Sequence, residues 1–185
     1  LSRVIMDLAD GEIKQNLNRF DSAQSFSKYI NKSYCKTASL IANSCKAAGV
    51  LSNLNDKELS SLYDFGKNIG LAFQVVDDIL DFTGNDKQLG KPAVSDLASG
   101  YLTAPVLYAL EENKQLSVLI NRELAEKNDL EDALCIIMNS KAIDSSRKLA
   151  EDFAMLSKEA IAWLPESEYK RALLALPEFV ISRIY

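Results

Sequence analysis

The sequence lacks histidine altogether, and its 185 residues include only three cysteines. Without histidine, Ser-His-Asp catalysis, Cys-His catalysis and a His-ligated zinc site are excluded within this chain. The odd number of cysteines, at positions 35, 45 and 135, matches neither a disulfide framework nor a metal motif and indicates reduced thiols. Acid–base chemistry would therefore have to use carboxylates, lysine, tyrosine or the substrate itself.

Proline and glycine are also scarce, with four and seven residues, and no alternating run of β-branched or aromatic residues predicts a strand. No stretch of about 20 apolar residues predicts a transmembrane segment. The net charge of −5 argues against a nucleic-acid groove, which needs a basic stripe, and against docking on an anionic membrane. A local cationic site for a small anion is compatible with this charge.

What the sequence does contain is helical spacing of its hydrophobic residues, which make up 48% of the chain. We predict an all-α fold with a single domain at 1–185. Asn55 and Glu58 form a capping pattern at the start of a long helix, and Gly49 is expected to end the helix before it. The predicted helices are 1–18, 26–48, a long helix that Asn55 caps and that ends at Phe82-Thr83-Gly84, 103–113, 115–127, 129–138, 141–163 and 167–184. The first residues resemble the middle of a helix without a cap, so we expect a further region upstream.

Residues 70–84, GLAFQVVDDILDFTG, place three aspartates among large apolar side chains. On a projection with about 100° per residue, Asp77, Asp81 and Asp78 lie about 40°, 80° and 140° from Phe73, the expected centre of the core stripe. Asp77 and Asp81 are therefore one turn apart at the inward edge of the helix. At an effective dielectric constant near 20, two such carboxylates repel by about 4 kcal/mol. The negative end of the helix dipole adds to this cost.

A bound cation would offset the repulsion between these carboxylates. Oxygen ligands without sulfur or imidazole suit Mg²⁺, which keeps several waters and prefers to bridge carboxylates to phosphates. The alternative is an acidic, solvated helix end with Asp78 exposed. The inward-facing pair beside Gln74 and Gly70 favours the metal site.

Two cationic segments could bind a phosphate. Lys36 and Thr37 lie in the middle of a helix rich in small residues, where Lys36 could extend into a cavity and Thr37 could donate a hydroxyl hydrogen bond. The alternative for Lys36 is a solvent-facing lysine. Lys91 lies in a Gly-Lys-Pro loop that follows the aspartates, and the same loop contains Asp96.

Five segments together carry a resemblance to a known family. They are GEIKQ (11–15), YCKTASLI (34–41), FGKNIGLAFQVVDDILDF (65–82), LGKPAVSDLASGYLTAPVLYAL (89–110) and PEFVISRIY (177–185). In this order and spacing, the chain resembles the C-terminal part of trans-isoprenyl diphosphate synthases, in particular the long-chain, solanesyl-type polyprenyl diphosphate synthases. FQVVDDILDF resembles the second aspartate-rich motif of that family.

The resemblance implies an isoprenoid-synthase-type helical bundle around a central cavity, here without its N-terminal helices, and a homodimer. The implied enzyme is a prenyltransferase that condenses isopentenyl diphosphate head-to-tail with an allylic diphosphate. Its products would be long-chain all-trans polyprenyl diphosphates for quinone side chains. Mg²⁺ would hold the allylic diphosphate and help it to leave, and the departing diphosphate would accept the final proton, which explains how a chain without histidine could act.

The resemblance also implies roles for individual residues. The metal ligands would be Asp77, Asp78, Asp81 and Asp96. Lys36, Thr37 and Lys91 would contact the diphosphate, and Gln74 would face the reacting end, so that Lys36, Thr37 and Gln74 are the catalytic candidates. Gln15 and Glu12 lie on a helix that lines the cavity, and Gln15 is a further substrate-binding candidate. Phe73 is expected to pack in the core.

Two departures from the family pattern stand out. Tyr101 follows Gly100, where many members have a lysine. The first aspartate-rich motif is absent from this chain, so we expect the chain alone to be inactive. One alternative is a non-catalytic partner subunit of a heteromeric synthase, although such a subunit would usually lose the metal aspartates. Another is a class I terpene cyclase, whose second metal motif is not found. The resemblance suggests a plastid, a mitochondrion or a bacterial cytoplasm.

Overall fold

The structure, a computed structural model, describes residues 2–84 and 94–185. Every regular element in these two ranges is a helix, and they contain no strand, which confirms the predicted all-α fold. The three cysteines are free thiols. No helix in the described ranges is long and apolar enough to cross a membrane.

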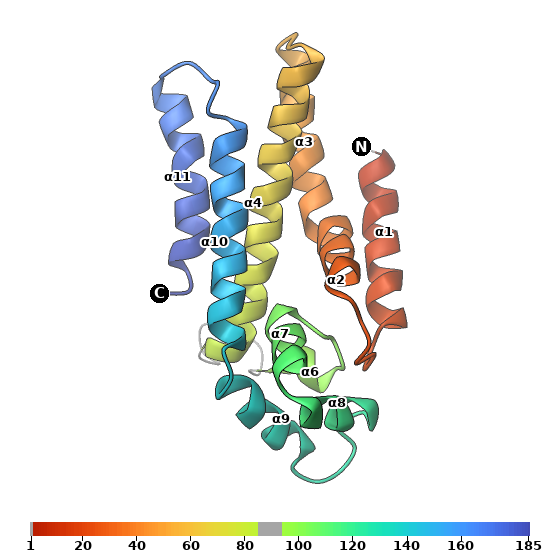
Figure 1. Cartoon of the computed structure of the whole chain (residues 1–185). Helices are drawn as coiled ribbons and strands as arrows, with labels where there is room; N and C mark the ends of the chain where they lie inside the picture. Colours follow the sequence, from red (N-terminus) through yellow and green to blue (C-terminus); the bar gives the residue numbers. More distant parts are fainter. Residues whose placement is uncertain (1, 85–93) are drawn as a thin grey trace.

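The long helix α4 (Asp56–Thr83) runs through the centre of the molecule (Figure 1). Its most extensive contacts are with α10 (Ala142–Ala160) on one side and α3 (Ser39–Leu51) on the other. The helix α11 (Glu168–Ser182) packs against α10 and α4. The helices α1 (Ser2–Leu17) and α2 (Phe26–Ser33) lie beyond α3 on the opposite flank.

Four short helices gather at the end of the bundle where α4 finishes (Figure 1). They are α6 (Ser95–Ala98), α7 (Ala104–Glu112), α8 (Lys114–Asn121) and α9 (Asp129–Met138). The helix α6 falls within a stretch for which the sequence predicted only a loop. The chain segment that carries Asp96 thus lies next to the end of α4 that carries the aspartates.

The start of α4 agrees with the sequence prediction in detail. The Asn55 side chain accepts hydrogen bonds from the N–H groups of Lys57 and Glu58, at 3.0 and 3.1 Å. In return, the Glu58 carboxylate accepts from the Asn55 N–H at 2.9 Å. This reciprocal cap satisfies donors that the first turn leaves unpaired. At the other end, α4 finishes at Thr83 with Gly84 as its C-cap, also as predicted.

The helix predicted at 26–48 is longer and is interrupted by a π-helical segment, η1 (Tyr34–Ala38), between α2 and α3. The prediction that Gly49 ends this helix is wrong, because Gly49 lies inside α3. It is small because α4 packs against it: an added Cβ would lie 2.8 Å from side-chain atoms of Leu59 and Leu62. The residue in the left-handed conformation after the helix is Asn53, with φ of 54°.

The small residues of η1 and α3 allow α4 to approach closely, as their composition suggested. A Cβ added to Gly70 would lie 2.6 Å from the Ala38 Cα, and one added to Gly66 would lie 2.7 Å from the carbonyl oxygen of Ile41. These distances leave no room for a side chain at either glycine. The close backbone contact brings η1, which carries Lys36 and Thr37, against the part of α4 that precedes the aspartates.

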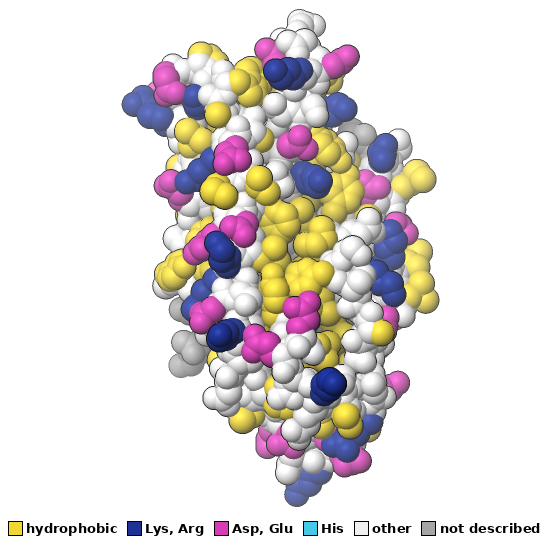
Figure 2. Space-filling view, in the orientation of Figure 1, with side chains coloured by type: hydrophobic (Ala, Val, Ile, Leu, Met, Phe, Trp, Pro, Cys, Tyr) yellow, Lys and Arg dark blue, Asp and Glu magenta, His cyan; other side chains and the backbone are white. Residues whose placement is uncertain are grey.

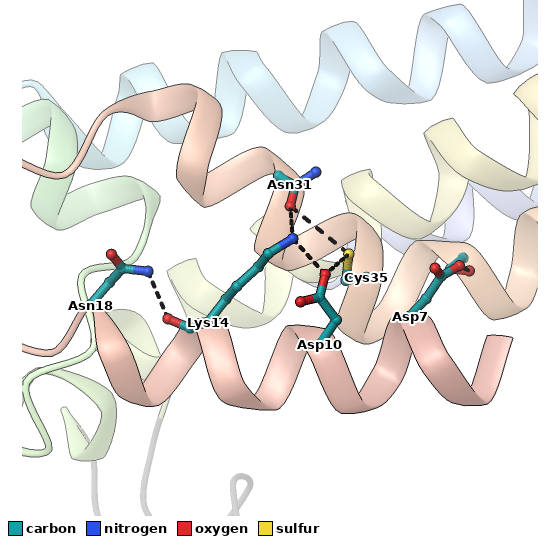
Figure 3. Close-up of polar contacts among 7 residues, drawn as sticks. Asp7, Asp10, Lys14, Asn18, Asn31 and Cys35 are labelled. Carbon is teal, nitrogen blue, oxygen red and sulfur yellow. Dashed lines mark hydrogen bonds and ion pairs between the residues drawn. The ribbon is translucent and has the colours of Figure 1, made fainter. Parts of the chain in front are cut away.

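The helix α1 docks on α2 and η1 through polar side chains (Figure 3). The Lys14 ammonium forms an ion pair with Asp10 at 2.6 Å and donates to the Asn31 side chain at 2.7 Å. A Cβ added to Gly11 would lie 3.0 Å from the backbone nitrogen of Lys36. This contact sets Glu12 and Gln15 beside η1.

Most hydrophobic side chains of α1 do not take part in this docking. Ile5, Leu8 and Ile13 are 70%, 45% and 59% exposed. Figure 2 also shows a band of hydrophobic side chains along the middle of one face of the molecule, with charged side chains on both sides of it. Leu40 of α3 and Phe73 of α4 are among the exposed hydrophobic residues of the structure. The described chain therefore leaves apolar surface uncovered.

Candidate active site

Lys36 extends from η1 toward α1, where two side chains hold its ammonium group. The ammonium donates to the Gln15 side-chain oxygen at 3.0 Å and forms an ion pair with Glu12 at 3.2 Å. The side chain of Lys36 is 34% exposed. Lys36 is therefore partly exposed but tethered to α1, and the two α1 residues that the sequence singled out are the ones in contact with it.

A continuous chain of hydrogen bonds joins η1, α4 and α2. The Thr37 hydroxyl donates to the Gln74 side-chain oxygen at 2.7 Å, and the Gln74 amide nitrogen donates to Asp78 at 2.9 Å. The Tyr29 hydroxyl donates to the other oxygen of Asp78 at 2.7 Å. Both oxygens of the Asp78 carboxylate are thus fixed by side chains from two helices.

Lys36, Gln74 and Asp78 border a small polar cavity of about 60 Å³. Predicted site residues from α1, η1, α4 and α6 line it together. The full lining is Gln15, Lys32, Ser33, Lys36, Gln74, Asp78, Asp96, Tyr101 and Thr103. Larger, mostly apolar hollows lie elsewhere, such as one of about 450 Å³ between α10 and α11, and that one contains none of the predicted site residues. The polar cavity is therefore the place where most of the predicted site residues come together.

Asp81 has a structural role at the start of α6. Its carboxylate accepts hydrogen bonds from the Ser95 hydroxyl at 3.2 Å and from the Asp96 N–H at 3.1 Å. Its own carbonyl oxygen accepts from the N–H of Val94 at 2.8 Å. Asp81 is 1% exposed. This carboxylate therefore positions the segment that brings Asp96 to the cavity.

Asp77 points to a different side of α4 and contacts the C-terminal segment. Its carboxylate lies 2.9 Å from the guanidinium of Arg183, which also stacks over the Phe73 ring at 4.8 Å from the ring centre. Phe73 is 36% exposed, so its predicted place in the core is wrong for the described chain. The sequence offered no signal that Arg183, more than 100 residues away, would lie here.

The expected order of burial among the aspartates is also wrong. Asp78 was placed furthest from the core, yet it is 3% exposed, whereas the Asp77 side chain is 39% exposed. The helical projection assumed one buried stripe centred on Phe73. Because α4 is covered by α3 and η1 on one side and by α10 and α11 on another, a second side of the helix is buried as well.

Burial raises the pKa of Asp78 to about 6, although Lys32, Tyr29 and Gln74 each favour the charged carboxylate. Burial likewise lowers the pKa of Lys32, and the neighbouring Lys36 lowers it further, whereas Asp78 and Asp96 act in the opposite direction. For both Asp78 and Lys32, burial therefore makes the charged form less favourable than it is in water. Such costs are typical of sites that are arranged to bind a charged ligand.

Replacing Asp78 by asparagine is expected to stabilise the metal-free protein at pH 7.5 by about 1–3 kcal/mol. Because the folded pKa lies about 2 units above the ordinary value, the folded state holds a proton between about pH 4 and pH 6 that the unfolded state has lost. Stability of the wild type therefore falls as pH rises through this window, and the variant lacks that fall. Unfolding in urea with a metal chelator, at pH 5 and pH 7.5, measures both effects.

The control for this experiment is Asp64→Asn, which changes an exposed aspartate on the same helix. It should leave the unfolding free energy unchanged at both pH values. A wild type that is more stable than Asp78→Asn at pH 7.5 would contradict the prediction. It would mean that the electrostatic attraction between the Asp78 carboxylate and the nearby Lys32 ammonium exceeds the desolvation cost.

The predicted metal ligands do not form a closed cluster. In the described ranges, no three carboxylate, thiol or imidazole side chains converge into a group that could hold a metal ion by themselves. Asp78 and Asp96 line the cavity, Asp81 lies behind them, and Asp77 lies on the Arg183 side of α4. This donor set fits an ion that takes one or two carboxylates and completes its shell with phosphate oxygens and water, as Mg²⁺ does. Lys91 lies outside the described residues.

The sequence profile of the polyprenyl synthetase family matches residues 1–137, about three quarters of the chain. The chain belongs to the polyprenyl synthetase family. A prenyl transferase of Synechocystis sp. is 50% identical over 185 residues, which cover all of this chain and 57% of that protein. Solanesyl diphosphate synthase 2, chloroplastic, of Arabidopsis thaliana is 46% identical over 184 residues, which cover this whole chain and 44% of that protein. The chain thus spans about half the length of these relatives.

Solved structures of polyprenyl synthetase family members share the fold. A polyprenyl synthase from Caulobacter crescentus, solved in complex with calcium and isoprenyl diphosphate, has a TM-score of 0.90 and 33% identity. The similarity covers all of this chain and 58% of that chain. The predicted isoprenoid-synthase-type bundle is thereby confirmed. Named relatives include cyanobacterial and chloroplastic proteins.

Several residues of the site were missed by sequence reasoning. Tyr29, Lys32, Ser33 and Thr103 border the cavity or bind Asp78, and Arg183 contacts Asp77. A signal existed for Lys32 and Ser33, because they lie about one turn before Lys36 and Thr37 and share their side of the helix. Tyr29, Thr103 and Arg183 become neighbours of the site only through the packing of separate helices.

Proposed function

We propose that this chain forms the half of the active site that carries the second aspartate-rich motif in a long-chain trans-polyprenyl diphosphate synthase. The proposed reaction joins isopentenyl diphosphate to an allylic diphosphate, with release of diphosphate, and repeats to give a long all-trans chain. The observation that carries the proposal is the polar cavity in which Lys36, Gln74, Asp78 and Asp96 meet. Membership of the polyprenyl synthetase family supports it.

The residues of the cavity suit a diphosphate that is bound together with a cation. Lys36 would contact a phosphate group, with Gln15 and Glu12 orienting its ammonium. Thr37 would also contact the diphosphate. Its hydroxyl donates to the Gln74 side-chain oxygen at 2.7 Å, and Gln74 would face the reacting end of the allylic substrate. Asp77, Asp78, Asp81 and Asp96 are the proposed ligands of Mg²⁺, directly or through water, and Asp81 also holds the segment that carries Asp96. Lys91 is proposed as a further phosphate contact on sequence grounds alone.

In the proposed reaction, the bond between the allylic carbon and its diphosphate oxygen breaks, and the double bond of isopentenyl diphosphate attacks the resulting cation. The new carbon–carbon bond forms, and a proton leaves to the departing diphosphate, so that no histidine is needed. Bound Mg²⁺ would neutralise the charge that develops on the leaving group. The Caulobacter crescentus polyprenyl synthase, which was solved with both calcium and isoprenyl diphosphate, supports the use of a divalent cation.

The band of exposed hydrophobic side chains on one face suits a hydrophobic substrate (Figure 2). We propose that this surface borders the space that receives the growing prenyl chain, since the wall of such a channel must be apolar. The solanesyl diphosphate synthase of Arabidopsis thaliana supports long-chain products, and the cyanobacterial and chloroplastic relatives favour a bacterial cytoplasm or a plastid. The use of these products for quinone side chains is proposed from the family resemblance alone. We further propose a homodimer, as the family resemblance implies.

Incubation of the purified native protein with isopentenyl diphosphate, a C15 or C20 allylic diphosphate and Mg²⁺ tests the proposed function. We expect all-trans polyprenyl diphosphates, identified by mass spectrometry after chain extension, and no product after metal chelation. If no product forms with either primer, the alternative of a non-catalytic partner subunit is favoured. That alternative predicts product only after a second, catalytic chain is added.

A further inference from the structure

Lys32 lies on the wall of the polar cavity, on the turn of α2 that precedes Lys36. Its ammonium lies 5.2 Å from the centre of the Tyr29 ring, and it forms no ion pair or hydrogen bond with a described residue. Lys36, in contrast, is already bound to Glu12 and Gln15. Lys32 is therefore the more available of the two cations that face this cavity.

Two buried hydroxyl groups open into the same cavity. Ser33 and Thr103 are 1% and 2% exposed. The Thr103 hydroxyl has no hydrogen-bond partner among the described residues, and the Ser33 hydroxyl has none apart from its neighbour Tyr29. Because buried polar groups are almost always paired, a phosphate group in the cavity would give the Thr103 hydroxyl a partner. The volume of about 60 Å³ has room for a few waters or for one phosphate group.

The two lysines that line the cavity are balanced by two aspartates, so the charge next to Lys32 depends on what the aspartates bind. Asp78 and Asp96 attract its ammonium, whereas Lys36 repels it. If the carboxylates of Asp78 and Asp96 bind a divalent cation, they no longer neutralise the positive charge of Lys32. A phosphate bound beside the cation would then neutralise that charge. Tyr101 lines this cavity at the position where the family pattern has a lysine. The side chains of Lys32 and Tyr101 therefore line the same cavity, although they belong to different segments of the fold.

We propose that Lys32 provides a cation of the diphosphate site from α2, in place of the lysine that this chain lacks after Gly100. The hydroxyls of Ser33 and Thr103 donate hydrogen bonds to the same phosphate group. This inference rests on the proposed prenyl transfer, because it assigns residues to the substrate of that reaction. It makes Lys32, Ser33 and Thr103 substrate-binding residues.

Calorimetric titration of the native protein with inorganic diphosphate and Mg²⁺ tests this assignment without relying on turnover. Lys32→Met is expected to raise the dissociation constant about ten- to hundredfold, the effect of one charge-assisted hydrogen bond. Lys32→Arg keeps the charge and should change it by no more than about threefold. The matched control is Lys28→Met, one turn earlier on α2, where the lysine side chain is 54% exposed and should not affect binding.

Moving the positive charge from position 32 to position 101 distinguishes a role of Lys32 in diphosphate binding from a purely structural role. Tyr101→Lys, introduced into the Lys32→Met variant, should recover most of the lost affinity, because residue 101 lines the same cavity. Tyr101→Lys alone serves as its control. Thr103→Val, which removes one hydroxyl at nearly constant volume, should weaken diphosphate binding by about two- to tenfold.

The outcomes distinguish this inference from the proposed function. If the wild type makes polyprenyl products and Lys32→Met binds diphosphate as tightly as Lys28→Met does, the role of Lys32 is wrong while the enzyme assignment stands. If the wild type neither turns over nor binds diphosphate, the proposed function fails and this inference fails with it. If Lys32→Met binds diphosphate more weakly and the added Tyr101→Lys restores the affinity, the result supports both the role of Lys32 and the proposed function.

Discussion

Replacing Asp77 by alanine is expected to lower the Mg²⁺-dependent turnover of the native protein at least about a thousandfold, a loss of roughly 4 kcal/mol of transition-state stabilisation. The physical reason is that this carboxylate, at 39% side-chain exposure, is the motif aspartate most open to solvent and therefore to a metal ion. Steady-state kinetics over a range of Mg²⁺ concentrations measures the effect.

The fold should not change in this variant. The contact between Asp77 and Arg183 is partly exposed on both sides, and such ion pairs contribute about 0–1 kcal/mol to stability. The unfolding midpoint of Asp77→Ala should therefore match that of Asp64→Ala, which removes an exposed carboxylate from the same helix. Arg183→Ala should retain most of the activity. Full turnover by Asp77→Ala would overturn its assignment as a metal ligand.

Replacing Gly70 by alanine is expected to destabilise the protein by about 1–2 kcal/mol, the upper part of the net effect of overpacking and helix propensity. A Cβ at this position would lie 2.6 Å from the Ala38 Cα, which belongs to the backbone of η1 and cannot move aside alone. Overpacking of this kind costs about 1–3 kcal/mol, occasionally more, and it outweighs the gain of about 1 kcal/mol in helix propensity. Because η1 would be pushed from α4, the contact of Thr37 with Gln74 should lengthen and activity should fall.

Gly49→Ala is the matched control for this substitution. A Cβ at Gly49 would also be crowded, at 2.8 Å, but the neighbouring atoms are the terminal methyl groups of Leu59 and Leu62, which can rotate away. Its effect on the unfolding free energy should therefore be close to zero. Denaturant unfolding of both variants measures the difference. Equal stability of Gly70→Ala and Gly49→Ala would mean that η1 and α4 can separate at little cost.

The local features of the chain were predictable because they depend on near neighbours in sequence. The reciprocal cap of Asn55 and Glu58, the end of α4 at Thr83 and the helical content all follow from short-range hydrogen bonding and side-chain periodicity. The role of Gly49 was misread for the same reason. A glycine near a helix end resembles a C-terminal cap, whereas here it makes room for Leu59 and Leu62 of α4.

The candidate site was only partly predictable. Gln15, Lys36, Gln74, Asp78 and Asp96 were chosen from the sequence, and the structure places all five around one cavity. The π-helical segment at Tyr34–Ala38 was not predicted, because its widened turn brings no distinctive residue pattern. Thr103 and Arg183 were missed because their contacts with the site join segments distant in sequence.

The sequence by itself determined the helical class, the family to which the chain belongs and the residue types available for catalysis, with carboxylates and lysines but no histidine. Only the tertiary structure decided which of those charges share a cavity. Asp78 is buried and Asp77 only half-buried, although they are adjacent in sequence, because α4 is covered on more than one side. Periodicity locates one face of a helix, whereas burial depends on every helix packed around it.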